Sequence, residues 1–336
     1  MDKIFYIGEF PPKYNGVSVK NELVLEALDG LDIKIVDVVN FKRGIKNALK
    51  CAFDLLNALI FGKKIIMGLG KSSRRNFIIR TYRMLHGKSK LSNIDIMVMG
   101  GGFHKLVSNE KTLSKAMPYL GTMWVESQIM IDTLKEYGAK KVLYFPNCRR
   151  GTDKKKPRKR DSNEIRFLYF SVICKAKGIE SILSLGDYFR DIKSYVDFYG
   201  EIVEDDKVYF ESEIEKCEYF NYCGVFDSVK NDVYALMNSY DVLLFPTMWK
   251  GEGVSGALVE SKLAGITAIA SDWNFNKEVV TDRIDGLLIS NGEGLKDAID
   301  SLIKEEGLLE RLKEGAAISA EKYMIENYSE FLKSTV

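Results

Sequence analysis

The chain has 336 residues, of which 46% are hydrophobic and 29% are charged, and its formal net charge is +2. These values are ordinary for a soluble protein of about two domains, and they give no sign of a nucleic-acid partner. The five cysteines are scattered, odd in number and form no CxxC pair. They argue against a disulfide framework and a zinc site, and they favour a reducing compartment.

The first predicted strand, residues 3–8, starts almost at the initiator methionine, so the sequence predicts no signal peptide. The most apolar stretch, residues 48–69, is interrupted by four charged residues and therefore predicts no membrane-spanning helix. We expect a cytoplasmic protein.

Strand-like and helix-like segments alternate along the first half of the chain. After the first strand come a proline- and glycine-containing loop and a helix over about residues 18–28, with Ser18 as its cap. A second helix is expected over about residues 44–61. Further strands are predicted in IKIVDV, KIIMGL, IDIMVM, LGTMWV and KVLYF. This alternation favours a parallel sheet covered by helices on both faces.

The pattern breaks after Pro146 into a polar, basic run, CRRGTDKKKPRKRDSNE, which is typical of a solvated linker. Strands are predicted again in IRFLYFSV, SYVDFYG and EYFNYCG. We therefore place a domain boundary near residues 147–163, between a first domain of residues 1–150 and a second domain of residues 151–317.

Residues 241–289 form the most informative stretch of the sequence. It reads as an apolar strand (Val242–Phe245), a loop, a helix, a second strand and a further loop. Glu252 lies where the first loop enters the helix, and Glu260 lies eight residues later. A helix N-terminus with small residues offers N–H groups and a positive dipole end to a phosphate. Two carboxylates beside such a site suggest hydroxyl groups on the ligand.

The Glu–seven–Glu spacing follows Phe245-Pro246 and precedes SDWNFNKEVV and DGLLI. In this setting it resembles the nucleotide-sugar signature of family-four glycosyltransferases. The resemblance implies the α/β GT-B fold, with two Rossmann-like parallel-sheet domains that face a cleft. A final helix, about residues 318–336, would cross back to the first domain. It also implies retaining transfer of a sugar from a nucleotide-diphosphate sugar to a saccharide acceptor, which is lipid-linked in many bacterial relatives that build surface polysaccharides.

The resemblance also assigns roles to individual residues. Glu260 is expected to hold the ribose hydroxyls, and Glu252 is expected to face the transferred sugar. Amides of the loop before the helix would hold the sugar and the diphosphate. The later loop, SDWNFNKEVV, carries Asn274 and Asn276 where relatives have a glycine-rich run. The expected donor-binding residues are Gly16, Lys175, Gly253, Val254, Ser255, Gly256, Glu260, Asn274, Asn276 and Glu278.

In relatives, an arginine and a lysine five residues apart, the lysine followed by glycine, grip the donor diphosphate. Lys177-Gly178 matches the second part of this pattern, but the arginine position falls on Val172. Lys175 is the candidate for the missing charge, although an ammonium lacks the planar fork of a guanidinium. Catalysis would then rest on positive charge at the leaving diphosphate, with no protein nucleophile and no metal.

Two loops of the first domain complete the candidate site. Gly16 would let the backbone approach a ligand closely at a helix start. His104 follows a strand and three glycines, at the edge where open α/β sheets bind ligands. We count His104 with Glu252 and Lys177 as a catalytic candidate, although a lone histidine there also fits a structural role. Two alternative functions stay open: a nucleotide-sugar epimerase, and a catalytically weak or silent subunit that supports a partner glycosyltransferase.

Residues 42–90 hold thirteen Lys or Arg residues and one acid, Asp54. Basic residues along an apolar stripe suit a helix at an anionic membrane surface. The alternative is that the stripe packs on the sheet while the charges face water. We predict contact of this segment with the inner face of the plasma membrane. The apolar residues are Ile45, Leu49, Phe53, Leu56 and Ile60, beside Lys46 and Lys50, and Phe77, Ile78, Tyr82 and Leu85, beside Arg74, Arg75, Arg80 and Arg83.

Overall fold

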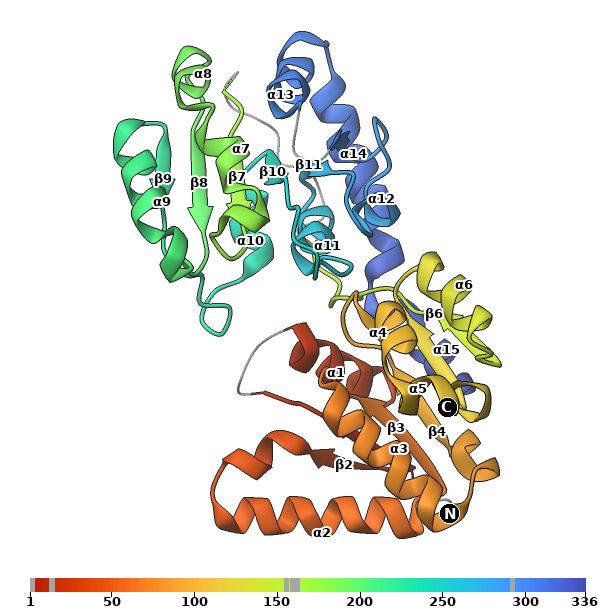
Figure 1. Ribbon diagram of the computed structural model, residues 1–336. Coiled ribbons are helices and arrows are strands. Elements are labelled where there is room, and N and C mark those ends of the chain that lie inside the picture. Colours follow the sequence, from red (N-terminus) through yellow and green to blue (C-terminus); the bar gives the residue numbers. More distant parts are fainter. Residues whose placement is uncertain (1–3, 12–15, 154–156, 158–163, 291–293) are drawn as a thin grey trace. The chain divides into compact units, whose positions relative to one another are not determined.

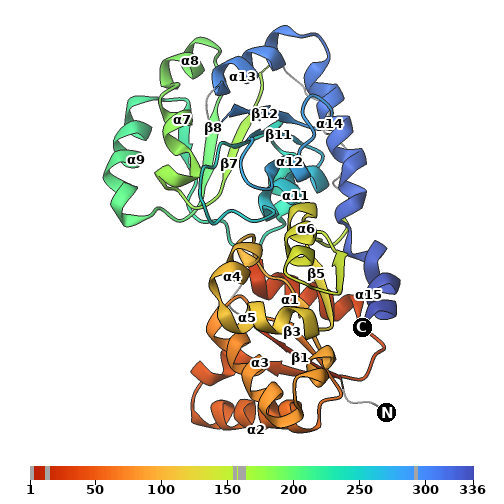
Figure 2. The ribbon, with the colours of Figure 1, turned by 45° about the vertical axis from the view of Figure 1, so that its right-hand side comes forward.

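The computed structural model describes residues 4–11, 16–153, 157, 164–290 and 294–336 (Figure 1). The chain divides into two compact units, Met1–Arg150 with Ile325–Val336, and Gly151–Met324. Each unit contains one six-stranded sheet, and the paired strands of both sheets are parallel (Figures 1 and 2). The predicted fold of two parallel-sheet α/β units is therefore confirmed.

The first sheet has the strand order β2-β1-β3-β4-β5-β6. Its connections leave β1 and β3 in opposite directions, which creates a topological switch point between these two strands. The strands are β1 Ile4–Gly8, β2 Ile33–Asp37, β3 Lys64–Gly68, β4 Ile94–Met97, β5 Thr122–Val125 and β6 Lys141–Tyr144. The helices are α1 Gly16–Ala27, α2 Ile45–Phe61, α3 Ser72–His86, α4 Phe103–Asn109, α5 Lys111–Ala116 and α6 Gln128–Glu136.

Right-handed crossovers place α1 on one face of this sheet and the helices after β2, β3, β4 and β5 on the other. On the α1 face, Tyr6, Leu23, Trp124 and Leu332 belong to one buried cluster. On the opposite face, α2 packs beside α3. The last residues of the chain thus contribute to the core that α1 covers.

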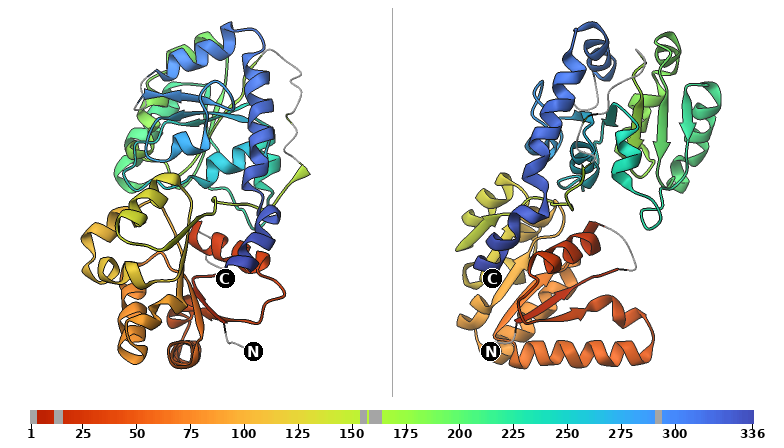
Figure 3. Two further views of the ribbon diagram at one scale, coloured as in Figure 1. Left: turned by 90° about the vertical axis from the view of Figure 1, so that its right-hand side faces the viewer. Right: turned by 180° about the vertical axis from the view of Figure 1, so that it is seen from behind.

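The chain returns to the first unit through η8 Ile325–Tyr328 and α15 Ser329–Thr335 (Figure 3). Ser329 Oγ donates to the Ala27 carbonyl at 2.6 Å, and Trp124 Nε1 donates to Thr335 Oγ1 at 3.1 Å. The predicted return of the C-terminal helix is confirmed.

A single helix over residues 318–336, however, is wrong. α14 Leu308–Ser319 is followed by the 3-10 turn η7 Ala320–Tyr323, and Met324 then takes an extended backbone with ψ 122°. An extended residue ends helical hydrogen bonding, and the following Ile, Asn and Tyr are weak helix formers.

The second sheet has the order β12-β11-β10-β7-β8-β9. Its strands are β7 Phe167–Phe170, β8 Val196–Tyr199, β9 Phe220–Tyr222, β10 Val242–Phe245, β11 Thr267–Ser271 and β12 Leu287–Ile289. Its helices, besides α14, are α7 Ile179–Leu183, α8 Gly186–Asp191, α9 Glu204–Lys216, α10 Val233–Asn238, α11 Gly256–Leu263, α12 Asn276–Val279 and α13 Leu295–Lys304. β12 is not among the predicted strands, because three residues after an Asp-Gly turn carry little periodicity.

Buried ion pairs fix α11 and α14 to this sheet. Lys262 Nζ lies 2.7 Å from Asp285 Oδ2 and donates to Ser319 Oγ at 2.9 Å. Lys313 Nζ lies 2.8 Å from Asp241 Oδ1. Among the helices of the described ranges, none combines the length and the apolar character that crossing a lipid bilayer requires.

Candidate active site

Three loops meet at the carboxyl edge of the second sheet. β10 lies between β7 and β11, so the loops that follow these strands, residues 171–178, 246–255 and 272–275, are neighbours. The connections leave β7 and β10 in opposite directions, which makes this edge the switch point of the sheet. Open α/β sheets bind ligands at such a point.

An ion pair joins two of these loops. Lys177 Nζ lies 2.6 Å from Glu252 Oε2, and Thr247 Oγ1 donates to the same oxygen at 2.9 Å. The Lys177 and Glu252 side chains are only 11% and 8% exposed. The fold therefore brings together two predicted catalytic residues that are 75 positions apart in the sequence.

Gly178 explains how Lys177 reaches this position. Its φ is 83°, in the left-handed region, and a Cβ atom there would lie 2.1 Å from the Pro246 carbonyl oxygen. Met248 N also donates to Ala176 O at 2.9 Å, which joins the two loops by their backbones. Only glycine permits this approach, so the Lys-Gly pair is a geometric requirement of the site.

Trp249 is a site residue that the sequence alone does not single out. Lys177 Nζ lies 4.4 Å from the centroid of its ring, which is a cation–π contact. A Cβ atom at Gly251 would come within 3.0 Å of the indole, so the loop is shaped around the ring. The available signal was that Trp249 is the single aromatic residue of the loop 246–255.

Asn274 ties the third loop to the second loop, and Asn276, the first residue of α12, ties that helix to the end of β11. Asn274 has a φ of 49° and donates to the carbonyl oxygens of Trp249 and Glu252, both at 3.3 Å. Asn276 is fully buried and donates to Ser271 O at 3.0 Å. Glu278 is half-buried in α12. Contacts of these three residues with a donor stay predictions.

α11 starts directly after the second loop. Ser255 is its N-cap residue and makes no side-chain hydrogen bond to the helix. Val254 and Ser255 are buried, whereas Gly253 and Gly256 are half-buried. The first N–H groups of a helix have no acceptor within it, and the dipole adds positive charge, so this end favours an anion. Glu260 is half-buried about one turn further along.

The side chain and the backbone N–H of Lys175 contact carboxylates of α7 and α9, whereas Lys177 contacts a carboxylate of the second loop. Its Nζ lies 3.1 Å from Glu180 Oε1, and its backbone N–H donates to Asp206 Oδ2 at 2.9 Å. Val172 is exposed, and compensation for its missing charge by Lys175 stays a prediction. Residues 204–206 form the first turn of α9, where acidic side chains interact favourably with the helix dipole.

At the edge of the first sheet, Asn21 ties the ends of β1 and β3 together. Its side-chain amide donates to Glu9 O and Gly68 O, both at 2.9 Å. Gly16 is exposed, and a Cβ atom there would meet nothing within 4 Å, so packing does not require a glycine. The expected cap Ser18 is wrong, because α1 starts at Gly16 and Ser18 is buried inside it. Residues 12–15 of the predicted loop lie outside the described residues.

His104 is half-buried in α4, which follows β4. Burial lowers the pKa of His104 below its ordinary value, and the nearby ammonium of Lys105 lowers this pKa further. The imidazole is therefore neutral at neutral pH, and a neutral imidazole can donate or accept a hydrogen bond. His104 and Gly16 both follow strands at the carboxyl edge of the first sheet.

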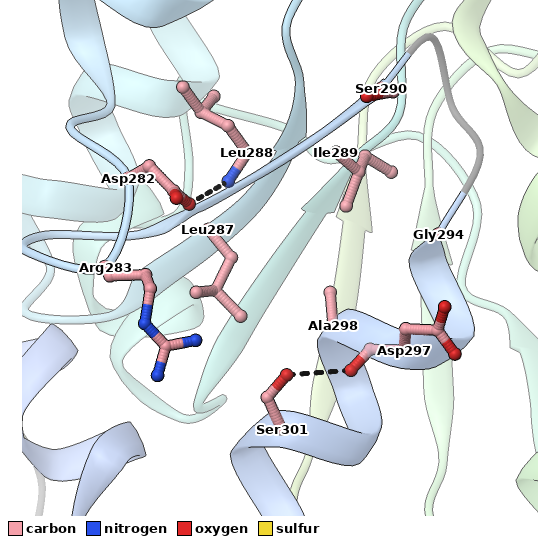
Figure 4. Close-up of a pocket in the computed structure, with 10 residues that line it drawn as sticks. All are labelled: Asp282, Arg283, Leu287, Leu288, Ile289, Ser290, Gly294, Asp297, Ala298 and Ser301. Carbon is pink, nitrogen blue, oxygen red and sulfur yellow. Dashed lines mark hydrogen bonds between the residues drawn. The ribbon is translucent and has the colours of Figure 1, made fainter.

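A further pocket lies between β12 and α13 (Figure 4). It is lined by residues such as Arg283, Leu287 and Asp297, and the Arg283 side chain is paired with Glu305. None of the predicted site residues lines it. Among the residues that the structure describes, no group of three or more His, Cys, Asp or Glu side chains is placed to hold a metal ion.

A switch-point site in an open parallel sheet, with a paired lysine and glutamate beside a helix start, fits a GT-B glycosyltransferase. Residues 151–318, half of the chain, match the family model described as glycosyl transferases group 1, and the chain belongs to this family. It is a nucleotide-sugar-dependent glycosyltransferase of a retaining family. The predicted family and enzyme class are confirmed.

Several known proteins are similar over most or all of their length. An uncharacterised glycosyltransferase of Methanocaldococcus jannaschii is 23% identical over 340 residues, covering 96% of this chain and 83% of the relative. Anabaena HepE in complex with UDP superposes with a TM-score of 0.75 at 13% identity, covering 100% and 99%. The apo lipopolysaccharide outer core galactosyltransferase WaaB has a TM-score of 0.66 at 13% identity, covering 98% and 99%. These structures support the GT-B fold.

Proposed function

We propose that the second unit binds a nucleotide-diphosphate sugar at the switch point and that the sugar is transferred, with retention, to a saccharide acceptor held by the first unit. The observation that carries this proposal is the Lys177–Glu252 pair, 2.6 Å apart and beside the start of α11. A cation and a helix N-terminus suit the diphosphate of such a donor, and a carboxylate suits a hydroxyl group of its sugar.

Each group has a distinct task in the proposed reaction. Lys177 and the first N–H groups of α11 stabilise negative charge on the departing diphosphate. An ammonium has three N–H donors, so Lys177 can contact a phosphate oxygen while one donor stays on Glu252. The second oxygen of Glu252 accepts a bond from a sugar hydroxyl, and Glu260 accepts bonds from the ribose hydroxyls.

The transfer itself needs no protein nucleophile. The acceptor hydroxyl attacks the anomeric carbon on the face from which the diphosphate leaves, the bond from that carbon to the diphosphate oxygen breaks, and the acceptor proton passes to the leaving phosphate. Because Lys177 and α11 supply the positive charge, the reaction should not require a metal ion. Turnover that EDTA abolishes would contradict this part.

The proposed acceptor is a saccharide, including lipid-linked forms, in surface polysaccharide or glycoconjugate synthesis. Support comes from the structural neighbour WaaB, whose name places its reaction in the lipopolysaccharide outer core. Peripheral association of residues 42–90 with the inner face of the plasma membrane would bring the first unit to such an acceptor. Gly16 and His104 are the proposed contacts of the first unit.

A donor panel tests the proposal. HepE has been solved with UDP-glucose, so this donor comes first, followed by sugars of GDP, ADP and dTDP. The correct donor should raise the melting temperature and release its nucleotide when an acceptor is present. Lys177→Ala should lower the rate of release by about 100-fold, while Lys207→Ala, at an exposed lysine of α9, should leave it unchanged.

The same panel separates the two alternative functions. Conversion of the donor sugar to an isomer, with no acceptor present, would indicate an epimerase. Binding without any nucleotide release would indicate a subunit that supports a partner enzyme, in line with Val172 at the arginine position.

A further inference from the structure

α2 carries an apolar side that does not face the protein. Cys51, Ala58 and Leu59 are buried on the inner side of the helix. The predicted stripe lies on the outer side and follows at intervals of four, four, three and four residues, so its members lie along one line. Their exposed fractions are 80% for Ile45, 67% for Leu49, 64% for Phe53, 53% for Leu56 and 40% for Ile60. The alternative in which this stripe packs on the sheet is therefore wrong.

α3 lies beside α2 (Figure 1), and it too exposes apolar side chains. Isolated exposed apolar residues are normal, but a group of this size on adjacent elements marks an interaction site. The predicted α3 stripe is only half exposed, because Ile78 and Tyr82, like Arg75, are buried. We call the whole surface the α2–α3 face; its residues are Phe41, Ile45, Leu49, Phe53, Leu56, Ile60, Phe61, Phe77, Met84 and Leu85.

Positive charge surrounds this face. Lys46 and Lys50 lie beside the stripe on α2, and both are exposed. Asp54, the one acid between residues 42 and 90, is paired with Lys34 at 2.8 Å. The exposed basic residues of this segment are Lys42, Lys46, Lys50, Lys63, Lys71, Arg80, Arg83, Lys88 and Lys90.

We propose that the α2–α3 face docks on an anionic lipid bilayer, with α2 lying in the plane of the interface. The stripe would enter the boundary of the acyl chains, and Lys46 and Lys50 would reach the phosphates of the headgroups. The proposal deepens the acceptor part of the proposed function and rests on it for its role in transfer. Its test requires no transfer.

Charge decides between a bilayer and a second copy of the chain. In a two-fold dimer the same patch occurs on both sides of the interface, so the basic rim of one copy would meet that of the other. Like charges brought together in this way oppose association. An anionic bilayer instead supplies negative charge along the whole rim and an apolar layer beneath it.

Co-sedimentation of the full chain with vesicles tests this proposal. The protein should bind vesicles that contain phosphatidylglycerol, bind phosphatidylcholine alone weakly, and dissociate as salt rises. Leu49→Ser with Phe53→Ser should weaken binding by about tenfold or more, because two apolar side chains no longer enter the bilayer. Lys46→Gln with Lys50→Gln should weaken binding to anionic vesicles and reduce its salt dependence. Val208→Ser, at an 81% exposed valine of α9, is the matched control and should bind like the native chain.

Three results would overturn the proposal: native protein that stays in the supernatant with every vesicle, binding that both double variants leave unchanged, or a dimer in light scattering that Phe53→Ser dissociates. Circular dichroism and melting confirm that each variant is folded, which we expect because the replaced side chains are exposed. Donor hydrolysis without lipid separates this proposal from the previous one. If the protein hydrolyses the donor but does not bind vesicles, only the membrane proposal fails. If the protein binds vesicles but does not hydrolyse the donor, only the proposed donor chemistry fails.

Discussion

The two sheets are built alike, yet their carboxyl edges carry different chemistry. In the second unit, a buried ion pair and several hydrogen bonds connect three loops around Lys177 and Glu252. The first unit also has a buried pair at this edge, Lys20–Glu126 at 2.5 Å, but Lys20 donates a second bond to the Val98 carbonyl, so this pair ties the ends of β4 and β5 together. Asn21 ties the ends of β1 and β3 in the same way, and His104 is half-buried and neutral. Charge that must act on a leaving group has to be in place before the reaction, because reorganising it costs energy. The second unit meets this requirement.

On the outer surface of the covering helices, it is the first unit that carries the distinctive feature. The first unit exposes the ten apolar side chains of the α2–α3 face within residues 41–85. The difference teaches that one architecture can hold reactive charge at a strand edge and also present a binding surface on its covering helices. The predictions below test how strictly the two tasks are divided.

The largest effect is expected for Lys177→Ala. Loss of a preorganised charge at the leaving diphosphate should lower turnover by about 100-fold. Lys175→Ala should cost several times less, because the Lys175 side chain is 48% exposed and water weakens the effect of its charge. Nucleotide release by the two variants is the measurement. Near-normal turnover of Lys177→Ala would show that the positive charge of Lys177 at the carboxyl edge of the second sheet is not what drives catalysis.

The two glutamates should separate binding from transfer. Glu260→Ala should weaken nucleotide affinity by about tenfold or more, since hydrogen bonds to a charged acceptor are strong. Glu252→Gln should reduce transfer more than nucleotide affinity, because its proposed partner is the sugar. Calorimetry with the free nucleotide and steady-state rates together decide this. Equal losses in both quantities for Glu252→Gln would refute the division of roles.

Trp249→Ala should lower turnover by roughly tenfold, because Lys177 loses the ring that holds its ammonium. We expect the change mainly in kcat, and Trp249→Phe should restore most of it. A purely structural role would instead lower the melting temperature and leave kcat of the folded protein unchanged. Measuring kcat, KM and melting for both variants separates these cases.

The smallest effect is expected in the first unit, for His104→Asn. Loss of one imidazole hydrogen bond to the acceptor should slow transfer by about fivefold, and donor hydrolysis by less. Because the pKa of His104 is lowered in the fold, stability linked to it is lost as the pH falls from the ordinary histidine pKa to the lowered one. The variant should therefore lose less stability than the native chain on acidification. An unchanged pH dependence of unfolding would contradict this.

Val172→Arg tests the departure from the family pattern. A guanidinium at this exposed position should raise donor hydrolysis if the loop lacks positive charge. The hydrolysis rate of this variant, beside that of Val172→Met as a control for size, is the measurement. No increase would mean that Lys175 or another group already supplies the charge.

Much of the fold was predictable because buried parallel strands form apolar runs that alternate with helices. Lys177-Gly178 and the two glutamates were also identifiable, since their spacing lies within single loops and helices. The Lys177–Glu252 pair was not, because it depends on β10 lying beside β7, and strand order is not local. Nor was the direction of the α2 stripe, since α2 is apolar on both its inner and outer sides.

The packing of α15 on the first unit affects how the protein is made. Trp124 leaves the ribosome long before Thr335, its hydrogen-bond partner 211 residues later. Until synthesis reaches that point, the apolar surface shared by Leu23, Trp124 and Leu332 stays open. A nascent chain in this state is a substrate for chaperones. A premature stop codon that removes only residues 325–336 would therefore damage the domain that was synthesised first.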